Sequence, residues 1–175
     1  MIMIFGRLSP MPFYKKMLLS QSIAFATSSS KATLSTAMEQ LHHRMGVSKT
    51  NTNFIMPLGA CINMDGAAIY LGLCAVFFAQ SYGVVLTPAN YMMLFLTCTL
   101  GSIGAAGIPS GSIIFMGMVL SSVGLPIEGI GIILGVDRIL DMIRTTVNIT
   151  GDATVTLLVD KSEKMLDEKT YYADN

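Results

Sequence analysis

The chain has 175 residues, of which 52% are hydrophobic and only 13% are charged, and its formal net charge at pH 7 is zero. This composition is too apolar for an ordinary water-soluble domain and favours the lipid bilayer as the solvent. A neutral chain without Trp has neither the basic surface nor the base-stacking side chains of a nucleic-acid-binding protein, so nucleic acid is excluded as a partner.

The first quarter of the chain predicts a connecting segment and a re-entrant hairpin. Residues 1–16 are expected to be the end of a preceding transmembrane helix and its connection, as in a chain that lacks upstream segments. Residues 17–46 are moderately apolar, but TSSSK at 27–31 interrupts them, so neither half reaches the roughly 20 residues of a spanning helix. We therefore expect a hairpin that enters and leaves on one side, with its tip at residues 28–31.

The next segment, residues 54–82, is long enough to cross a membrane but contains a polar interruption. Asn63 and Asp65 stand two positions apart, between Gly59 and Gly66, and would point to opposite faces of a regular helix. They converge only if the backbone unwinds, and an unwound segment exposes carbonyls that can bind a cation. The sequence therefore predicts a transmembrane helix broken at NMD. The alternative is that these polar side chains only join neighbouring helices.

The remaining elements repeat this order. Residues 91–124 predict a second re-entrant hairpin with a Gly-rich tip at 105–110, residues 130–159 a polar transmembrane helix, and residues 160–175 a solvated cytoplasmic tail. The expected fold is an all-α membrane protein with two hairpins, two transmembrane helices and an inverted repeat. Short, interrupted segments at matching positions of two repeats are typical of the binding site of a secondary transporter.

The distribution of basic residues predicts the orientation. Lys and Arg flank the first hairpin and recur in the tail, whereas the connections at 83–90 and 125–129 contain none. Because short cytoplasmic loops are rich in Lys and Arg, we expect the first hairpin to open to the cytoplasm and the second to open to the outside. We therefore expect a multi-pass protein of the cell membrane, which is the inner membrane or the plasma membrane.

The last predicted helix carries the strongest functional signal. At about 100° per residue, six polar residues fall on one narrow face, namely Asp137, Asp141, Arg144, Thr145, Asn148 and Asp152. Each ionisable side chain at the membrane centre costs about 2.5 to 3.5 kcal/mol, so such residues normally line a site. The alternative is a solvated face on a surface helix.

The residue types indicate the ligands of this face. Arg144 can bind a carboxylate with two parallel hydrogen bonds, and Asp141, one turn earlier, can accept from an ammonium group. Together they suit an amino acid. Asp152 and Asn148 supply hard oxygen ligands for a small cation.

Four motifs carry a family resemblance. They are TSSSKATL at 27–34, PLGACINMDGAAIY at 57–70, SIGAAGIPSG at 102–111 and DRILDMIRTTVNITGD at 137–152. In this order they resemble the glutamate/aspartate and dicarboxylate:cation symporter family, which includes the excitatory amino-acid transporters. The resemblance implies a homotrimer in the full-length parent, a membrane lipid environment, and this chain as the C-terminal half of the transport domain.

The resemblance also implies individual ligands, without any cofactor besides Na⁺ as coupling ion. The implied substrate-binding residues are Ser28, Ser29, Ser30, Ala67, Gly107, Asp141, Arg144, Thr145 and Asn148. The implied cation ligands are Gly59, Cys61, Asn63, Asp65, Ser102, Ile103, Ala105, Asn148 and Asp152. A further cation site would combine Asn63 and Asp65 with an upstream helix.

The expected function is cation-coupled symport of an acidic amino acid or dicarboxylate, with Na⁺ favoured over H⁺. Ala67 stands where the family has Thr, and Lys31 where it has a small residue or Ser, so the substrate stays open. The alternatives are a truncated fragment that does not transport and an intramembrane aspartyl protease. The second is disfavoured because Ile149 occupies the first Gly position of a GxGD motif, and we expect no enzymatic activity.

Overall fold

The computed structural model describes residues 1–104 and 111–173. These residues form helices and connections, without a strand among them. The elements are α1 (Ile2–Phe5), α2 (Pro10–Thr27), α3 (Ser30–Glu39), the π-helix η1 (Gln40–Arg44), α4 (Lys49–Ile62), α5 (Asp65–Ser81), α6 (Pro88–Gly104), α7 (Gly111–Ser122), α8 (Ile130–Leu134), α9 (Asp137–Ser162) and α10 (Glu168–Tyr172).

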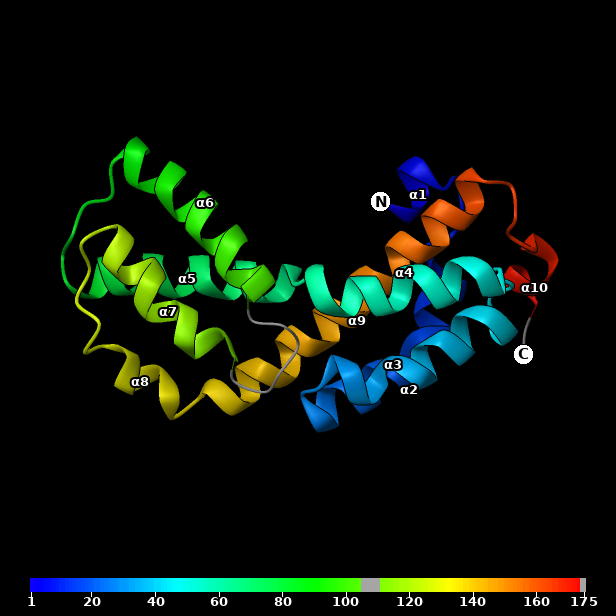
Figure 1. Cartoon of the computed structure of the whole chain (residues 1–175), viewed down its shortest axis with the longest axis horizontal. Helices are drawn as coiled ribbons and strands as arrows, with labels where there is room; N and C mark the ends of the chain where they lie inside the picture. Colours follow the sequence, from blue (N-terminus) through cyan, green and yellow to red (C-terminus); the bar gives the residue numbers. More distant parts are fainter. Residues whose placement is uncertain (105–110, 174–175) are drawn as a thin grey trace.

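The molecule is elongated, and α4 and α5 lie end to end along it (Figure 1). Helix α9 packs against both, so it connects the two halves. One hydrophobic core lies among α2, α3, η1, α4, the second half of α9 and α10. The other lies among α5, α6, α7 and α8. Both termini are in the first half (Figure 1).

Helices α2 and α3 pack on each other and are joined by Ser28 and Ser29. Ser28 has φ 52°, ψ 34°, a left-handed conformation that ends α2, and the Ser29 hydroxyl accepts from the backbone N–H of Ala32 as the N-cap of α3. Helix α2 begins earlier than the expected hairpin, at Pro10, a residue suited to a first helical turn. Entry and exit of this pair on one side of a membrane stays a prediction.

The broken helix has its interruption at Asn63 and Met64. Asn63 (φ −96°, ψ 77°) and Met64 (φ −105°, ψ 53°) leave the helical conformation between α4 and α5. By length and composition, the helical run Lys49–Ser81 is long and apolar enough to cross a membrane, and it is the one such run within the described ranges. Helix α9 fails that test because its buried face is polar.

The second half differs in detail from the expected elements. Helices α6 and α7 pack against each other, while the expected tip at 105–110 lies outside the described residues. The helix expected at 130–159 is divided into α8 and α9 by a turn in which the N–H of Val136 bonds to the carbonyl of Ile133. Helix α9 then continues to Ser162. Ile133 of the separate helix α8 is buried in the second core.

The tail also differs from the solvated segment that we expected. It contains α10, whose Tyr171 is completely buried in the first core.

Candidate functional site

All six residues of the predicted polar face of α9 are buried. The opposite face is apolar and outward, with Ile139 and Ile143 59% and 49% exposed. A helix in water would show the reverse pattern, because exposed aliphatic side chains and buried charges both cost free energy there. The arrangement fits a helix whose outer face meets lipid or apolar neighbours and whose inner face lines a site.

Arg144 is the centre of a buried ionic cluster. Its Nη2 donates to Oδ1 of Asp141 at 2.7 Å, and its Nη1 donates to Oδ1 of Asp137 at 3.3 Å. The guanidinium also lies 4.0 Å from the centroid of the Tyr70 ring. The Tyr70 hydroxyl donates to the same Asp137 oxygen at 2.9 Å. Two carboxylates and a ring face therefore compensate one buried cation.

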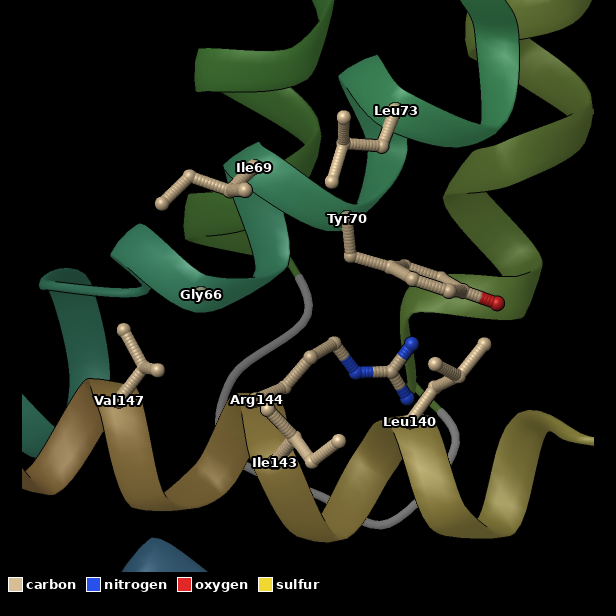
Figure 2. Close-up of a pocket in the computed structure, with 8 residues that line it drawn as sticks. All are labelled: Gly66, Ile69, Tyr70, Leu73, Leu140, Ile143, Arg144 and Val147. Carbon is tan, nitrogen blue, oxygen red and sulfur yellow. The ribbon is translucent and has the colours of Figure 1, made fainter. Parts of the chain in front are cut away.

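This cluster borders a cavity of about 140 Å³ between α5 and α9. Figure 2 shows Arg144 extending from α9 beneath the Tyr70 ring. The remaining lining residues are small or aliphatic, namely Gly66, Ile69, Leu73, Leu140, Ile143 and Val147. Arg144 and Tyr70 are thus the polar residues of an otherwise apolar lining, and the guanidinium is engaged by Asp141 and Asp137.

Asp152 forms a second polar centre, between α9 and the end of α4. Its side chain is 1% exposed, and its Oδ1 accepts from Nδ2 of Asn63 at 2.9 Å. Its Oδ2 is buried without a hydrogen-bond partner among the described residues. A Cβ added to Gly59 would lie 2.6 Å from Oδ1, so only glycine allows the carboxylate to approach α4 this closely. An unpartnered carboxylate oxygen in this position fits a hard cation such as Na⁺.

Asn148 connects the helix break to α9. Its Oδ1 accepts from the backbone N–H of Gly66 at 2.8 Å, and its Nδ2 lies 3.3 Å from the sulfur of Met64. A Cβ on Gly66 would lie 2.6 Å from the carbonyl oxygen of Arg144, so this contact also needs glycine. Asn148 therefore supports the N-terminus of α5, and its expected binding of substrate and cation stays a prediction.

Asn63 and Asp65 both approach Gly151. A Cβ at Gly151 would lie 3.2 Å from Nδ2 of Asn63 and 3.3 Å from Oδ2 of Asp65. The break thus brings both side chains to the same part of α9. Asp65 is exposed at a groove of about 450 Å³ that also contains Gln21 and Thr150.

Residues 1–162 match the sodium:dicarboxylate symporter family. The chain belongs to this family. It is 42% identical to excitatory amino acid transporter 2 of Homo sapiens over 147 residues, which are 84% of the chain and 26% of that protein. It is 41% identical to neutral amino acid transporter A of Bos taurus over 150 residues, which are 86% of the chain and 28% of that protein.

The chain thus spans less than a third of the length of these two relatives. Its family and its relatives are membrane transporters and not enzymes, so the aspartyl protease alternative is excluded.

The hairpin serines of this family member have different environments. The Ser29 hydroxyl is engaged in capping α3, and Ser30 is buried. The Ser28 hydroxyl is buried without a hydrogen-bond partner in the part of the chain that the structure describes. Among the described residues, the Ser28 hydroxyl is therefore available for a ligand.

The other expected ligands of the chain have different surroundings. Cys61 and Ile103 are exposed, and the hydroxyl of Ser102 is bonded to the carbonyl of Thr99. Ala67 is buried beside Met64 and the partly buried Phe115, and Thr145 is buried on α9. Ala105 and Gly107 lie outside the described residues.

Two members of the cluster had no assigned role in the sequence interpretation. Asp137 was placed on the polar face of α9 without a ligand role, and Tyr70 was missed. The signal for Tyr70 was its position on the inner face of α5, three and four residues after the buried Ala67 and Gly66. A tyrosine on that face needs a polar partner, which Asp137 supplies.

Proposed function

We propose that this chain is the substrate- and cation-binding part of a membrane symporter that couples uptake of an acidic amino acid or dicarboxylate to Na⁺ rather than H⁺. The observation that carries the proposal is the buried Asp152, whose Oδ2 has no partner among the described residues. A buried carboxylate oxygen without a hydrogen bond costs free energy, and a bound cation removes that cost. Two further features support the assignment.

The first supporting feature is the set of oxygen atoms near Asp152. Asn63 bonds to the carboxylate, and both lie in a pocket of about 180 Å³ that Gly59 also borders. The interruption of the helix at Asn63 leaves backbone carbonyls of α4 without regular helical partners. Carboxylate, amide and backbone oxygens are the ligands that hard cations prefer. Na⁺ would be held by Asp152 and by oxygens of this segment.

The second supporting feature is Arg144. Its planar guanidinium can bind a carboxylate with two parallel hydrogen bonds, and its Nε and Nη2 now both donate to Oδ1 of Asp141. We propose that a substrate carboxylate replaces part of this pairing, which leaves Asp141 to accept from the substrate ammonium group. The names of the relatives include both excitatory and neutral amino acid transporters. Arg144 favours the acidic substrate.

Substrate access is proposed to follow from the two helix pairs. In this proposal α2 with α3 and α6 with α7 are re-entrant hairpins related by an inverted repeat, and the second acts as the outer gate. Ser28 and residues at 105–110, with Gly107 among them, would contact the substrate, and Ser102, Ile103 and Ala105 would contact a cation. The full-length protein would be a homotrimer in the cell membrane.

The test is uptake of labelled aspartate by liposomes that contain the full-length protein. We expect uptake when Na⁺ is higher outside than inside, and little uptake when only a proton gradient is applied. A proton gradient that drives uptake equally well without Na⁺ would overturn the Na⁺ assignment. The same liposomes should show lower uptake of a neutral amino acid, and preference for the neutral substrate would overturn the role of Arg144.

The present chain should be tested separately in detergent. Sodium binding by the chain without aspartate binding would assign it the cation site alone. Absence of both would remove the proposal for this chain.

A further inference from the structure

The tail helix α10 is buried against the base of the α2–α3–η1 unit. The Tyr171 side chain is fully buried, and its hydroxyl donates to the carbonyl of Ser9, which precedes α2, at 2.8 Å. The N–H of Ser9 donates to the Tyr172 hydroxyl at 3.2 Å. Where the chain leaves η1, the N–H of Asp167 donates to the carbonyl of Gly46 at 3.0 Å. The tail therefore contacts both the start of α2 and the segment that follows η1.

Lys16 of α2 lies at the centre of these contacts and is 3% exposed. Its ammonium donates to the carbonyl of Arg44 at 2.7 Å, of Thr170 at 2.8 Å and of Tyr171 at 3.0 Å. These carbonyls belong to the last turns of η1 and α10, where the partial negative charge of a helix attracts a cation. One buried ammonium therefore caps two helices that are more than 120 residues apart in the sequence.

Two further contacts join the same region to the end of α9. Asp160, which is completely buried near the end of α9, accepts from the N–H of Ser48 and from Nδ2 of Asn51 at the start of α4. Lys161 forms an ion pair with Glu168 in α10. The start of α4, the end of α9 and the tail are thus connected by polar contacts.

We propose that α10 is a clamp, anchored by Lys16, that locks the base of the α2–α3–η1 unit to the end of α9. With the clamp closed, these helices move as one body. The α6–α7 pair packs in the other core, and its described residues make none of the contacts named above.

The chemistry of Tyr171 supports a closed clamp at neutral pH. Burial raises the pKa of Tyr171 to about 12, so its hydroxyl keeps the proton that it donates to Ser9. The hydrogen bond from Tyr171 to Ser9 therefore does not change with pH near neutrality.

The test is amide hydrogen exchange of the purified full chain in detergent, comparing the parent with Lys16→Met. Methionine retains an apolar stem of similar length but leaves the three carbonyls without the ammonium. We expect exchange in residues 40–47 and 167–173 to become faster by about tenfold or more, the effect of losing a hydrogen bond to a charged group. Exchange in α5 and α6 should stay within twofold.

The matched control is Lys169→Met, which removes the same charge from an exposed position of the same tail. It should leave exchange in residues 40–47 unchanged. A clamp is contradicted if Lys16→Met does not change exchange in residues 40–47. It is also contradicted if α5 and α6 become faster to the same extent, because Lys16 would then stabilise the whole fold.

Two further variants keep the proposal testable if Lys16→Met does not fold. Tyr171→Phe retains the buried ring and removes only the bond to Ser9, and we expect severalfold faster exchange of residues 167–173. Removal of residues 163–175 should speed exchange of residues 40–47 while α5 stays protected. A truncated chain that keeps the parental exchange at 40–47, or that fails to fold at all, would overturn the clamp.

Discussion

A single methyl group at Gly59 should disable the proposed cation site. A Cβ built at this position would lie 2.6 Å from Oδ1 of Asp152 and 2.9 Å from its Cγ, both far inside van der Waals contact. Asp152 is buried where α9 packs against α4, so the helices have little freedom to separate. The carboxylate must rotate away and lose its hydrogen bond from Asn63.

The magnitude follows from that lost bond. A hydrogen bond to a charged group contributes about 1.5 to 3 kcal/mol, which corresponds to roughly a 10- to 150-fold change in an equilibrium constant. We therefore expect Gly59→Ala to weaken Na⁺ binding by about that factor. The change acts on the cation because Asp152 loses its position, while Arg144 and Asp141 keep theirs.

The assay is titration of purified parent and variant with NaCl at constant ionic strength, followed by calorimetry or by the rise in Tm. Gly72→Ala is the control, because its added Cβ meets only the Cys98 sulfur at 3.9 Å, an ordinary contact. Circular dichroism checks that both variants remain helical. Parental Na⁺ affinity in a folded Gly59→Ala protein would refute the assignment of Asp152 to a cation.

Two further predictions concern the substrate and the tail. Replacing Arg144 by Cys in the full-length protein removes the fork that matches a carboxylate, so uptake of labelled aspartate should be lost while some neutral amino-acid uptake remains. Undiminished aspartate uptake would show that Arg144 only compensates Asp141. Asp167 caps α10, and hydrogen bonding from Thr170 lowers the pKa of its carboxyl below the unfolded value. Its stabilising contribution is therefore present above about pH 4 and lost as the pH falls through the lowered folded pKa. Exchange of the α10 amides, corrected for intrinsic rates, should show this acid step in the parent and not in Asp167→Asn, and a step that persists in the variant would assign it to another group.

Local patterns in the sequence were sufficient for the main features of α9 and of the broken helix. The burial of Asp141, Asn148 and Asp152 on one face follows from a period of 3.6 residues, which no distant contact alters. The break at Asn63 follows from polar residues next to glycine. These features depend on neighbours within two turns, so the sequence contains the necessary information.

Features that depend on distant partners could not be predicted in this way. The pairing of Arg144 with Asp141 and Asp137 is a choice of side-chain rotamer that depends on the Tyr70 ring from another helix. Lys16 appeared as one more basic residue flanking a hairpin, because its three carbonyl partners lie 28 to 155 positions away.

The inverted relationship of the two helix pairs remains a prediction, and its physical basis is the alternation of apolar arms with glycine- or serine-rich connections. What the structure adds is the asymmetry between the pairs. The first is joined to the tail by hydrogen bonds from the buried ammonium of Lys16 to the carbonyls of Thr170 and Tyr171. The second packs in a core of apolar side chains.

The most direct test of the central claim is the dependence of aspartate affinity on Na⁺ concentration in the full-length protein and in its Asp152→Asn variant. Asparagine keeps the shape of the side chain and removes the charge that attracts the cation. Because the binding of substrate and cation is linked, the parent should bind aspartate more tightly as Na⁺ rises. The variant should show the same rise displaced to higher Na⁺ concentration, with much of the affinity restored at the highest concentration. Superimposable curves would remove Asp152 from the cation site, and a parental Kd for aspartate that does not change with Na⁺ would contradict Na⁺ coupling altogether.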